Sequence, residues 1–79
     1  MNDDELDELI LGRLRQRRGQ ATETADRTLT SADLAVFFNE PEERVRDRLR
    51  ALAAEGRVKE STAAPDRWMI VIAGEAPGP

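Results

Sequence analysis

The chain contains neither cysteine nor histidine, and these absences remove most metal and thiol chemistry. Without cysteine there are no disulfides and no thiol nucleophile, and without either residue the usual zinc sites cannot form. The sequence also lacks a glycine-rich phosphate loop and a Ser/His arrangement. We therefore expect no enzyme activity, no catalytic or metal-binding residue, no cofactor and no small-molecule substrate.

Aromatic residues and long apolar runs are scarce as well. The 79 residues include one tryptophan, two phenylalanines and no tyrosine, so the core must consist mostly of Leu, Ile, Val and Ala. No apolar run approaches the ~20 residues of a membrane span, and the N-terminus has no signal-peptide pattern. The length corresponds to one small domain. We expect a cytoplasmic protein without a membrane partner.

Charge is distributed unevenly along a chain whose net charge is −4. Residues 1–40 hold five basic and nine acidic residues, whereas residues 41–79 hold seven of each. One predicted helix carries four closely spaced arginines, Arg44, Arg46, Arg48 and Arg50. The net charge argues against broad, non-specific affinity for DNA, but a local cluster of arginines in an acidic chain suggests an anionic partner, above all nucleic acid.

The first helix is predicted from Asp3 to Arg18. Asn2 can cap it, with Glu5 at the third position of a capping box. Acidic residues lie at its start and arginines at its end, as the helix dipole favours. We expect Gly19 to end the helix, followed by a surface loop to Arg27. The inward face of this first helix is predicted to consist of Leu6, Leu9, Ile10 and Leu14.

A second helix is predicted to open at Thr30 and to end at Asn39. Thr30 is a good N-cap, and Asp33 occupies the third position of a capping-box-like signal. Asn39 tolerates the left-handed conformation that ends many helices. The residues expected to face inward are Leu34, Ala35 and Phe38. Thr28 and Leu29 are expected to add a very short strand before this helix.

A third helix is predicted between Pro41, a favoured first-turn residue, and Gly56. Val45, Leu49 and Leu52 follow helical spacing and must face the core. At ~100° per residue, Arg46 and Arg50 flank one side of that stripe, and Arg44 and Arg48 flank the other. Glu43 and Asp47 are expected to point outward.

A hairpin is predicted to close the fold. Its strands are expected at residues 57–62 and 67–72, joined by a turn at residues 63–66. Trp68, Ile70 and Ile72 should share one face of the second strand. Residues 1–72 then form the domain, and residues 73–79, rich in Gly and Pro, are expected to be a disordered tail.

This order of elements resembles the winged helix-turn-helix family, an α+β fold with three helices and a two-stranded wing. The stretch Thr30–Ala35, the apolar Phe38, the turn at Asn39–Pro41 and the segment Glu55–Val58 carry the resemblance, which covers about residues 5–72. Glu40 departs from it, because an apolar residue is usual in that turn. The long loop before Thr28 is a second departure.

The resemblance implies that the third helix enters the major groove of double-stranded DNA and that the wing contacts the backbone. An arginine can bind guanine O6 and N7, and a helix N-terminus can hold phosphate. The chain would then be a sequence-specific DNA-binding protein, either a small transcriptional regulator or a mobile-element accessory protein. The residues assigned to DNA contact are Thr30, Ser31, Glu43, Arg44, Arg46, Asp47, Arg48, Arg50, Arg57, Lys59, Arg67 and Trp68.

The wing also shows a narrower similarity to Z-alpha winged helices, which bind left-handed nucleic acid. Pro65 precedes Trp68 by three residues, and Pro41 lies in the turn between helices. The polar residues of that family's third helix are replaced by Arg46 and Arg50. Only Pro65 and Trp68 are therefore carried over, and packing of Trp68 against the third helix is the preferred interpretation.

Two other interpretations remain open. The arginines could pair with neighbouring carboxylates at helical spacing and only keep the domain soluble. Alternatively, a winged helix can bind proteins, which the acidic first helix and the exposed positions of Val36 and Phe37 favour. A homodimer that reads a palindromic site would have to use the first or second helix. Cancellation of the positive face by Glu43, Asp47 and Glu60 would favour protein contact over DNA.

Overall fold

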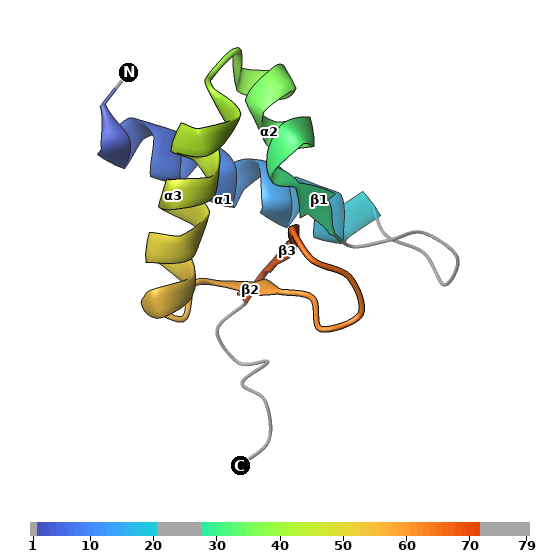
Figure 1. The fold of residues 1–79 in the computed structure, drawn as a ribbon. Helices are drawn as coiled ribbons and strands as arrows, with labels where there is room; N and C mark the ends of the chain where they lie inside the picture. Colours follow the sequence, from blue (N-terminus) through green and yellow to red (C-terminus); the bar gives the residue numbers. More distant parts are fainter. Residues whose placement is uncertain (1, 21–27, 72–79) are drawn as a thin grey trace.

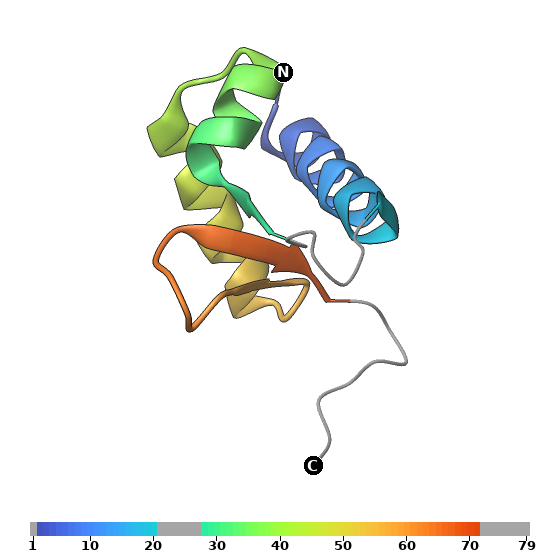
Figure 2. The same ribbon diagram turned by 90° about the vertical axis from the view of Figure 1, so that its right-hand side faces the viewer.

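The computed structural model describes residues 2–20 and 28–71, which form three helices and a three-stranded antiparallel sheet. Figures 1 and 2 show β2 and β3 beside the lower end of α3, and β1 leading directly into α2. This arrangement confirms the α+β prediction and is compatible with a winged-helix layout. In chain order the elements are α1 (Asp3–Gln20), β1 (Leu29–Thr30), α2 (Ser31–Phe38), α3 (Glu42–Ala54), β2 (Val58–Glu60) and β3 (Arg67–Ile70).

The three strands pair in the order β1-β3-β2. Leu29 of β1 lies opposite Trp68 of β3, and Val58 of β2 lies opposite Ile70. The short first strand was predicted one residue too early, and both hairpin strands are shorter than predicted. β3 is thus the central strand, and its alternate residues Trp68 and Ile70 are buried. The predicted tail at 73–79 and most of the predicted loop at 19–27 lie outside the described residues.

Helix α1 begins as predicted but extends further. The side chain of Asn2 accepts a hydrogen bond of 2.8 Å from the backbone N–H of Glu5. Gly19 does not end the helix, which continues to Gln20. The predicted inward face was wrong at Leu9, which is 43% exposed, while Leu11 is buried in its place. The reason is that β3 also packs on α1 and turns its buried face toward Leu11.

Helix α2 has both predicted caps. The Thr30 hydroxyl accepts from the backbone N–H of Asp33 (3.0 Å), and the Asp33 carboxylate accepts from the N–H of Thr30 (3.2 Å). Asn39 adopts the left-handed conformation, with φ of 55°. Helix α3 begins directly after Pro41, as predicted, and Pro41 is its N-cap.

Helix α3 ends at a glycine that needs a positive φ. Gly56 has φ of 77°. Its N–H donates to the carbonyl of Ala53 (3.0 Å), and the N–H of Arg57 donates to that of Leu52 (2.9 Å). These two bonds form a Schellman motif, which satisfies the last carbonyls of the helix and directs the chain into β2.

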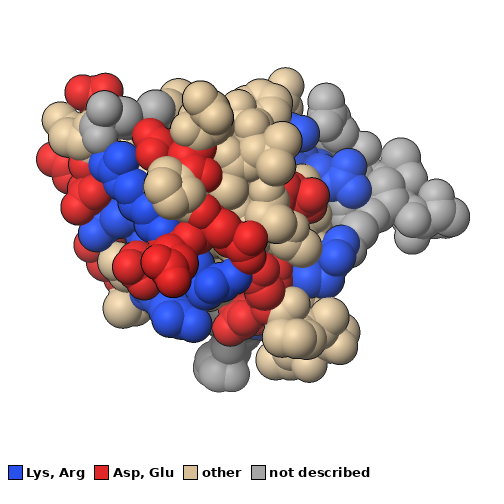
Figure 3. Space-filling model, turned by 45° about the horizontal axis from the view of Figure 1, so that its top comes forward, with Lys and Arg blue, Asp and Glu red and all other residues tan. Residues whose placement is uncertain are grey.

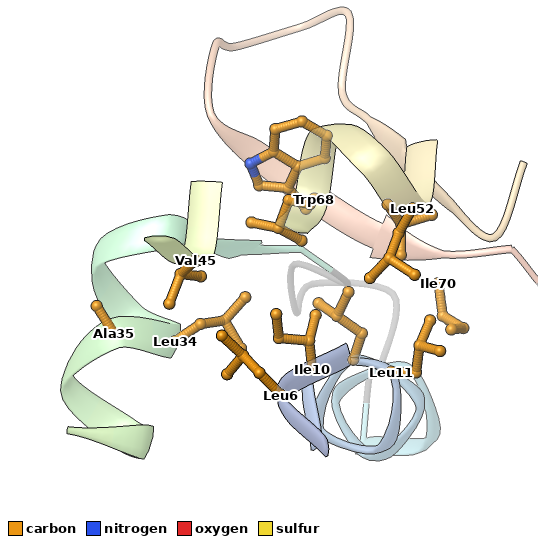
Figure 4. Close-up of a cluster of buried hydrophobic side chains, with 12 residues drawn as sticks. Leu6, Ile10, Leu11, Leu34, Ala35, Val45, Leu52, Trp68 and Ile70 are labelled. Carbon is orange, nitrogen blue, oxygen red and sulfur yellow. The ribbon is translucent and has the colours of Figure 1, made fainter. Parts of the chain in front are cut away.

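The core lies between the helices and the sheet (Figure 4). Leu6, Ile10 and Leu11 project into it from α1, toward the labelled side chains of α2, α3 and β3. As predicted, α3 contributes Val45, Leu49 and Leu52, each at most 1% exposed. The core residues are Leu6, Ile10, Leu11, Leu14, Leu34, Ala35, Val45, Leu49, Leu52, Val58, Trp68 and Ile70.

Candidate functional site

The arginines of α3 lie in two pairs, one on each side of its buried stripe, as the helical spacing predicted. We call Arg44 and Arg48, which contact α1, the inner pair, and Arg46 and Arg50 the outer pair. Arg48, of the inner pair, faces α1 and makes a two-pronged contact with Asp7. Its Nε and Nη2 atoms donate to the Asp7 Oδ1 and Oδ2 atoms at 2.8 and 2.7 Å. These bonds raise the pKa of Arg48 despite partial burial, and the nearby carboxylates of Asp7, Asp3 and Glu55 raise it further.

Arg44 repeats this arrangement one turn earlier. Its guanidinium lies 3.3 Å from an Asp3 oxygen and 3.2 Å from a Glu40 oxygen. Asp3 and Asp7 are four residues apart on α1, as Arg44 and Arg48 are on α3. The inner pair therefore joins two helices and is not directed toward an external anion. This equal spacing was the sequence signal that could have revealed the contact.

Arg46 belongs to the outer pair, but it too is held by carboxylates of the chain. It forms an ion pair with Glu42 one turn before it. The same guanidinium donates to the Ser31 hydroxyl at 3.4 Å and lies 3.9 Å from a carboxylate oxygen of Asp66. Arg46 thus contacts the start of α2 and the hairpin turn.

Asp66 connects the hairpin turn to the helices, a role that no sequence pattern indicated. Its Oδ2 atom accepts from the Ser31 hydroxyl (2.7 Å), and its Oδ1 atom accepts from the indole N–H of Trp68 (2.9 Å). Asp66 has φ of 58°, and its own N–H donates to Glu60 (2.8 Å). Partial burial raises the pKa of Asp66, but the bonds from Trp68 and Ser31 and the charge of Arg46 outweigh it, so the pKa is lowered.

Two predicted contact residues are not presented to a ligand. Ser31 is fully buried and Trp68 is 3% exposed, because both side chains bond to Asp66 inside the fold. Trp68 also belongs to the core cluster. Their assignment to DNA contact is therefore corrected. Thr30, a third predicted contact, is half-buried and uses its hydroxyl to cap α2.

The outward face of α3 gathers four of the predicted contact residues. Glu43, Arg46, Asp47 and Arg50 line one shallow hollow there. Glu43, Asp47 and Arg50 are exposed. Among the described residues, no hydrogen bond or ion pair engages the Arg50 side chain. The face therefore carries two carboxylates, one paired arginine and one unpaired arginine.

The hairpin adds three cationic side chains that differ in their exposure and in their contacts. Arg57 is exposed and lies at the limit of an ion pair with Glu8 (3.8 Å). Lys59 is exposed beside the equally exposed Glu60. Arg67 donates from Nε to the Thr28 hydroxyl at 3.0 Å, which ties β3 to the segment before β1. No continuous positive strip therefore runs from the described part of the hairpin to α3.

The charged surface is accordingly mixed. Glu43, Asp47 and Glu60, whose cancellation of the positive face was the predicted criterion for protein contact, are all exposed. Figure 3 shows blue and red side chains interleaved over α3 and an area of uncharged residues over α2. Because positive and negative side chains alternate over α3, their electrostatic potentials largely cancel within a Debye length of the surface, about 8 Å at physiological salt.

Within residues 2–20 and 28–71, three large apolar side chains are exposed outside the core. Val36 and Phe37 of α2 are 83% and 61% exposed, and Leu9 of α1 is 43% exposed. The Arg13 guanidinium lies over the Phe37 ring, 4.8 Å from its centroid, in a cation–π contact. This contact places the exposed side of α1 next to that of α2. We call Leu9, Arg13, Val36 and Phe37 the α1/α2 patch.

Other site classes find little support in the described part of the chain. Among residues 2–20 and 28–71, no three His, Cys, Asp or Glu side chains are grouped to hold a metal ion. In the same ranges, no helix is both long and apolar enough to cross a membrane.

Comparison of the chain with protein-family models, with curated proteins and with solved structures found no match. Function must therefore be inferred from the side chains described above.

Proposed function

We propose that the chain is a winged-helix domain whose main role is to bind protein. The element order, the tight turn between α2 and α3 and the hairpin beside α3 support the winged-helix assignment. Winged helices serve several functions, so the role must be argued from the surface.

The single observation that carries this proposal is that most of the α3 arginines are already paired within the fold. Arg44, Arg46 and Arg48 are all engaged by carboxylates of the same chain. Affinity for duplex DNA comes largely from cations that neutralise phosphates and release counterions. Cations already neutralised within the fold contribute little of that free energy.

The α1/α2 patch supplies what a protein contact needs. Interface cores are enriched in aromatic residues and arginine, and they are depleted in carboxylates. Phe37 with Arg13 over its ring fits that composition, and Val36 extends the apolar area.

A pull-down with the tagged full chain tests this proposal. The double variant Val36→Ser, Phe37→Ser removes apolar surface from exposed positions, so it should fold like the wild type, as far-UV circular dichroism can check. We expect a protein partner retained by the wild type and lost by the variant in quantitative mass spectrometry. Equal retention by the two chains would overturn the proposal.

A second candidate, sequence-specific binding of double-stranded DNA, is supported by the outward face of α3. Arg46 and Arg50 could each contact guanine, and Glu43 and Asp47 could accept from the amino group of cytosine. Such a mixed face would select sequences without binding phosphate strongly, as a small transcriptional regulator requires.

A titration of a labelled mixed-sequence duplex at low and physiological salt separates the two candidates. The variant of choice is Arg50→Ala, because Arg46 also holds the hairpin turn and its loss would disturb the fold. Arg15→Ala, an exposed site on α1, is the control with the same change in charge. Protein contact as the main role predicts no binding by any of the three chains. Binding that weakens only for Arg50→Ala would establish the DNA candidate.

A further inference from the structure

Helix α1 carries an exposed ridge that the core and the ion pairs leave unused. Glu5, Leu9 and Arg13 follow one another at intervals of four residues, so they line up along one side of the helix. Glu5 is exposed, Leu9 is 43% exposed, and Arg13 is half-buried, with its guanidinium over the Phe37 ring and donating to the Gln16 side chain at 3.4 Å. Among the described residues, neither Glu5 nor Arg13 takes part in an ion pair.

The charges of this ridge are complementary to those of a second copy in the opposite direction. Glu5 and Arg13 lie at equal distances on either side of Leu9, about 6 Å along the axis at 1.5 Å per residue. An antiparallel pair that meets at Leu9 therefore sets Glu5 of each helix against Arg13 of the other. The whole helix repeats the pattern, with acidic residues in its first turn and arginines in its last.

We propose that two copies of this chain associate through α1 in an antiparallel, twofold pair centred on Leu9. This inference rests on the proposed protein-binding function and names its partner. Residues four apart form the ridges that interdigitate when helices cross in the commonest packing class. A twofold contact uses the same patch on both chains, as the position of Leu9 between opposite charges requires.

The surface beside Leu9 leaves room for the partner helix. A shallow hollow lined by Asp4, Glu5, Glu8 and Leu9 lies on the same side of α1. A side chain added at Gly12 would meet no atom within 4 Å, so the helix is open there as well. Phe37 flanks the ridge and would widen the apolar contact.

One helix on each side gives a modest contact. The 18 residues of α1 span about 27 Å, and specific stable interfaces bury about 800 Å² per partner. Because one helix with part of a second is a small contact and its ion pairs are exposed, we expect association that is concentration-dependent and weakened by salt.

Sedimentation equilibrium of the full chain over a wide concentration range tests the pair. Glu5→Arg and Arg13→Glu each set like charges against each other and should each shift the association constant toward monomer by at least tenfold. The double variant Glu5→Arg, Arg13→Glu restores opposite charges and should recover most of the association. Failure of the double variant to recover would overturn the charge arrangement.

Gly12→Leu provides an independent test. A Cβ at this position meets no atom within 4 Å, and the substitution removes a flexible residue from an exposed helical site, so the monomer should melt at the same or a higher temperature. In the pair, the new side chain would occupy the space between the helices and abolish association. Unchanged association, or a wild type that is monomeric at every concentration, would overturn the proposed pair. A monomeric wild type that still retained a protein partner through Phe37 would leave the proposed function standing.

Discussion

Removal of the Asp66 carboxylate should destabilise the fold more than its partly exposed position suggests. The carboxylate is the acceptor for two buried donors, the Trp68 indole and the Ser31 hydroxyl. An unsatisfied buried donor costs about 1–3 kcal/mol. The Ser31 hydroxyl has a second acceptor, Glu42 at 3.5 Å, so most of the loss should come from Trp68.

Backbone conformation adds to this cost, and a series of variants separates the contributions. Alanine is disfavoured at φ of 58° by about 1–2 kcal/mol, whereas glycine and asparagine tolerate this conformation. We expect losses of about 3 kcal/mol for Asp66→Ala, about 2 for Asp66→Gly, and about 1 for Asp66→Asn, which keeps one acceptor oxygen.

Urea unfolding followed by tryptophan fluorescence measures these losses, because Trp68 is the only tryptophan and lies at the site itself. For a domain of this size, a loss of about 3 kcal/mol corresponds to a fall of more than about 10 °C in melting temperature. A loss below about 0.5 kcal/mol for Asp66→Ala, typical of an ordinary surface substitution, would refute the role of Asp66 as an acceptor.

The same series predicts a dependence on pH. The pKa of Asp66 is lowered from 3.8 in the folded protein, so the folded state holds the proton less readily than the unfolded chain. The stability contributed by the carboxylate is therefore present above pH 3.8 and is lost as the pH falls through the folded pKa. The difference between wild type and Asp66→Asn should shrink over that range, and a constant difference would contradict the assignment.

Substitutions at four further positions test the helices by thermal or urea unfolding. Thr30→Ala should cost about 1 kcal/mol by removing the α2 cap, whereas Thr30→Ser should cost little; equal losses would show that the methyl group matters and the cap does not. The same substitution should have opposite signs at two glycines: Gly56→Ala should destabilise by about 1 kcal/mol because φ is positive, and Gly12→Ala should stabilise by about 0.5–1 kcal/mol within an open helical site. Leu49→Ala should cost about 2–5 kcal/mol, since the side chain is fully buried, and a loss below 1 kcal/mol would place Leu49 outside the core.

Features encoded within a few residues were predictable from the sequence. The capping box of Thr30 and Asp33, the left-handed Asn39 and the glycine at the end of α3 depend on backbone groups three or four positions away. The buried stripe of α3 was predictable too, because its three apolar residues follow a single helical period and α3 is covered from one side.

Features that depend on several packed elements were not predictable in the same way. Leu9 was assigned to the core and Leu11 was overlooked, since the hydrophobic spacing of α1 did not show that β3 would cover the Leu11 side. The Arg48–Asp7 contact joins residues 41 positions apart. The role of Asp66 required both the hairpin turn and the start of α2 to be in place, so no local pattern marked it.

The connection between the hairpin turn and α2 has a consequence for any partner that touches the hairpin. A turn held by Ser31, Trp68 and Arg46 has few alternative positions, so the hairpin should move together with the helices. A partner that binds it would not have to order a mobile segment, and little conformational entropy would be lost in the encounter. The affinity of a partner for the hairpin should then depend on how well it fits the shape that the hairpin already has in the free protein.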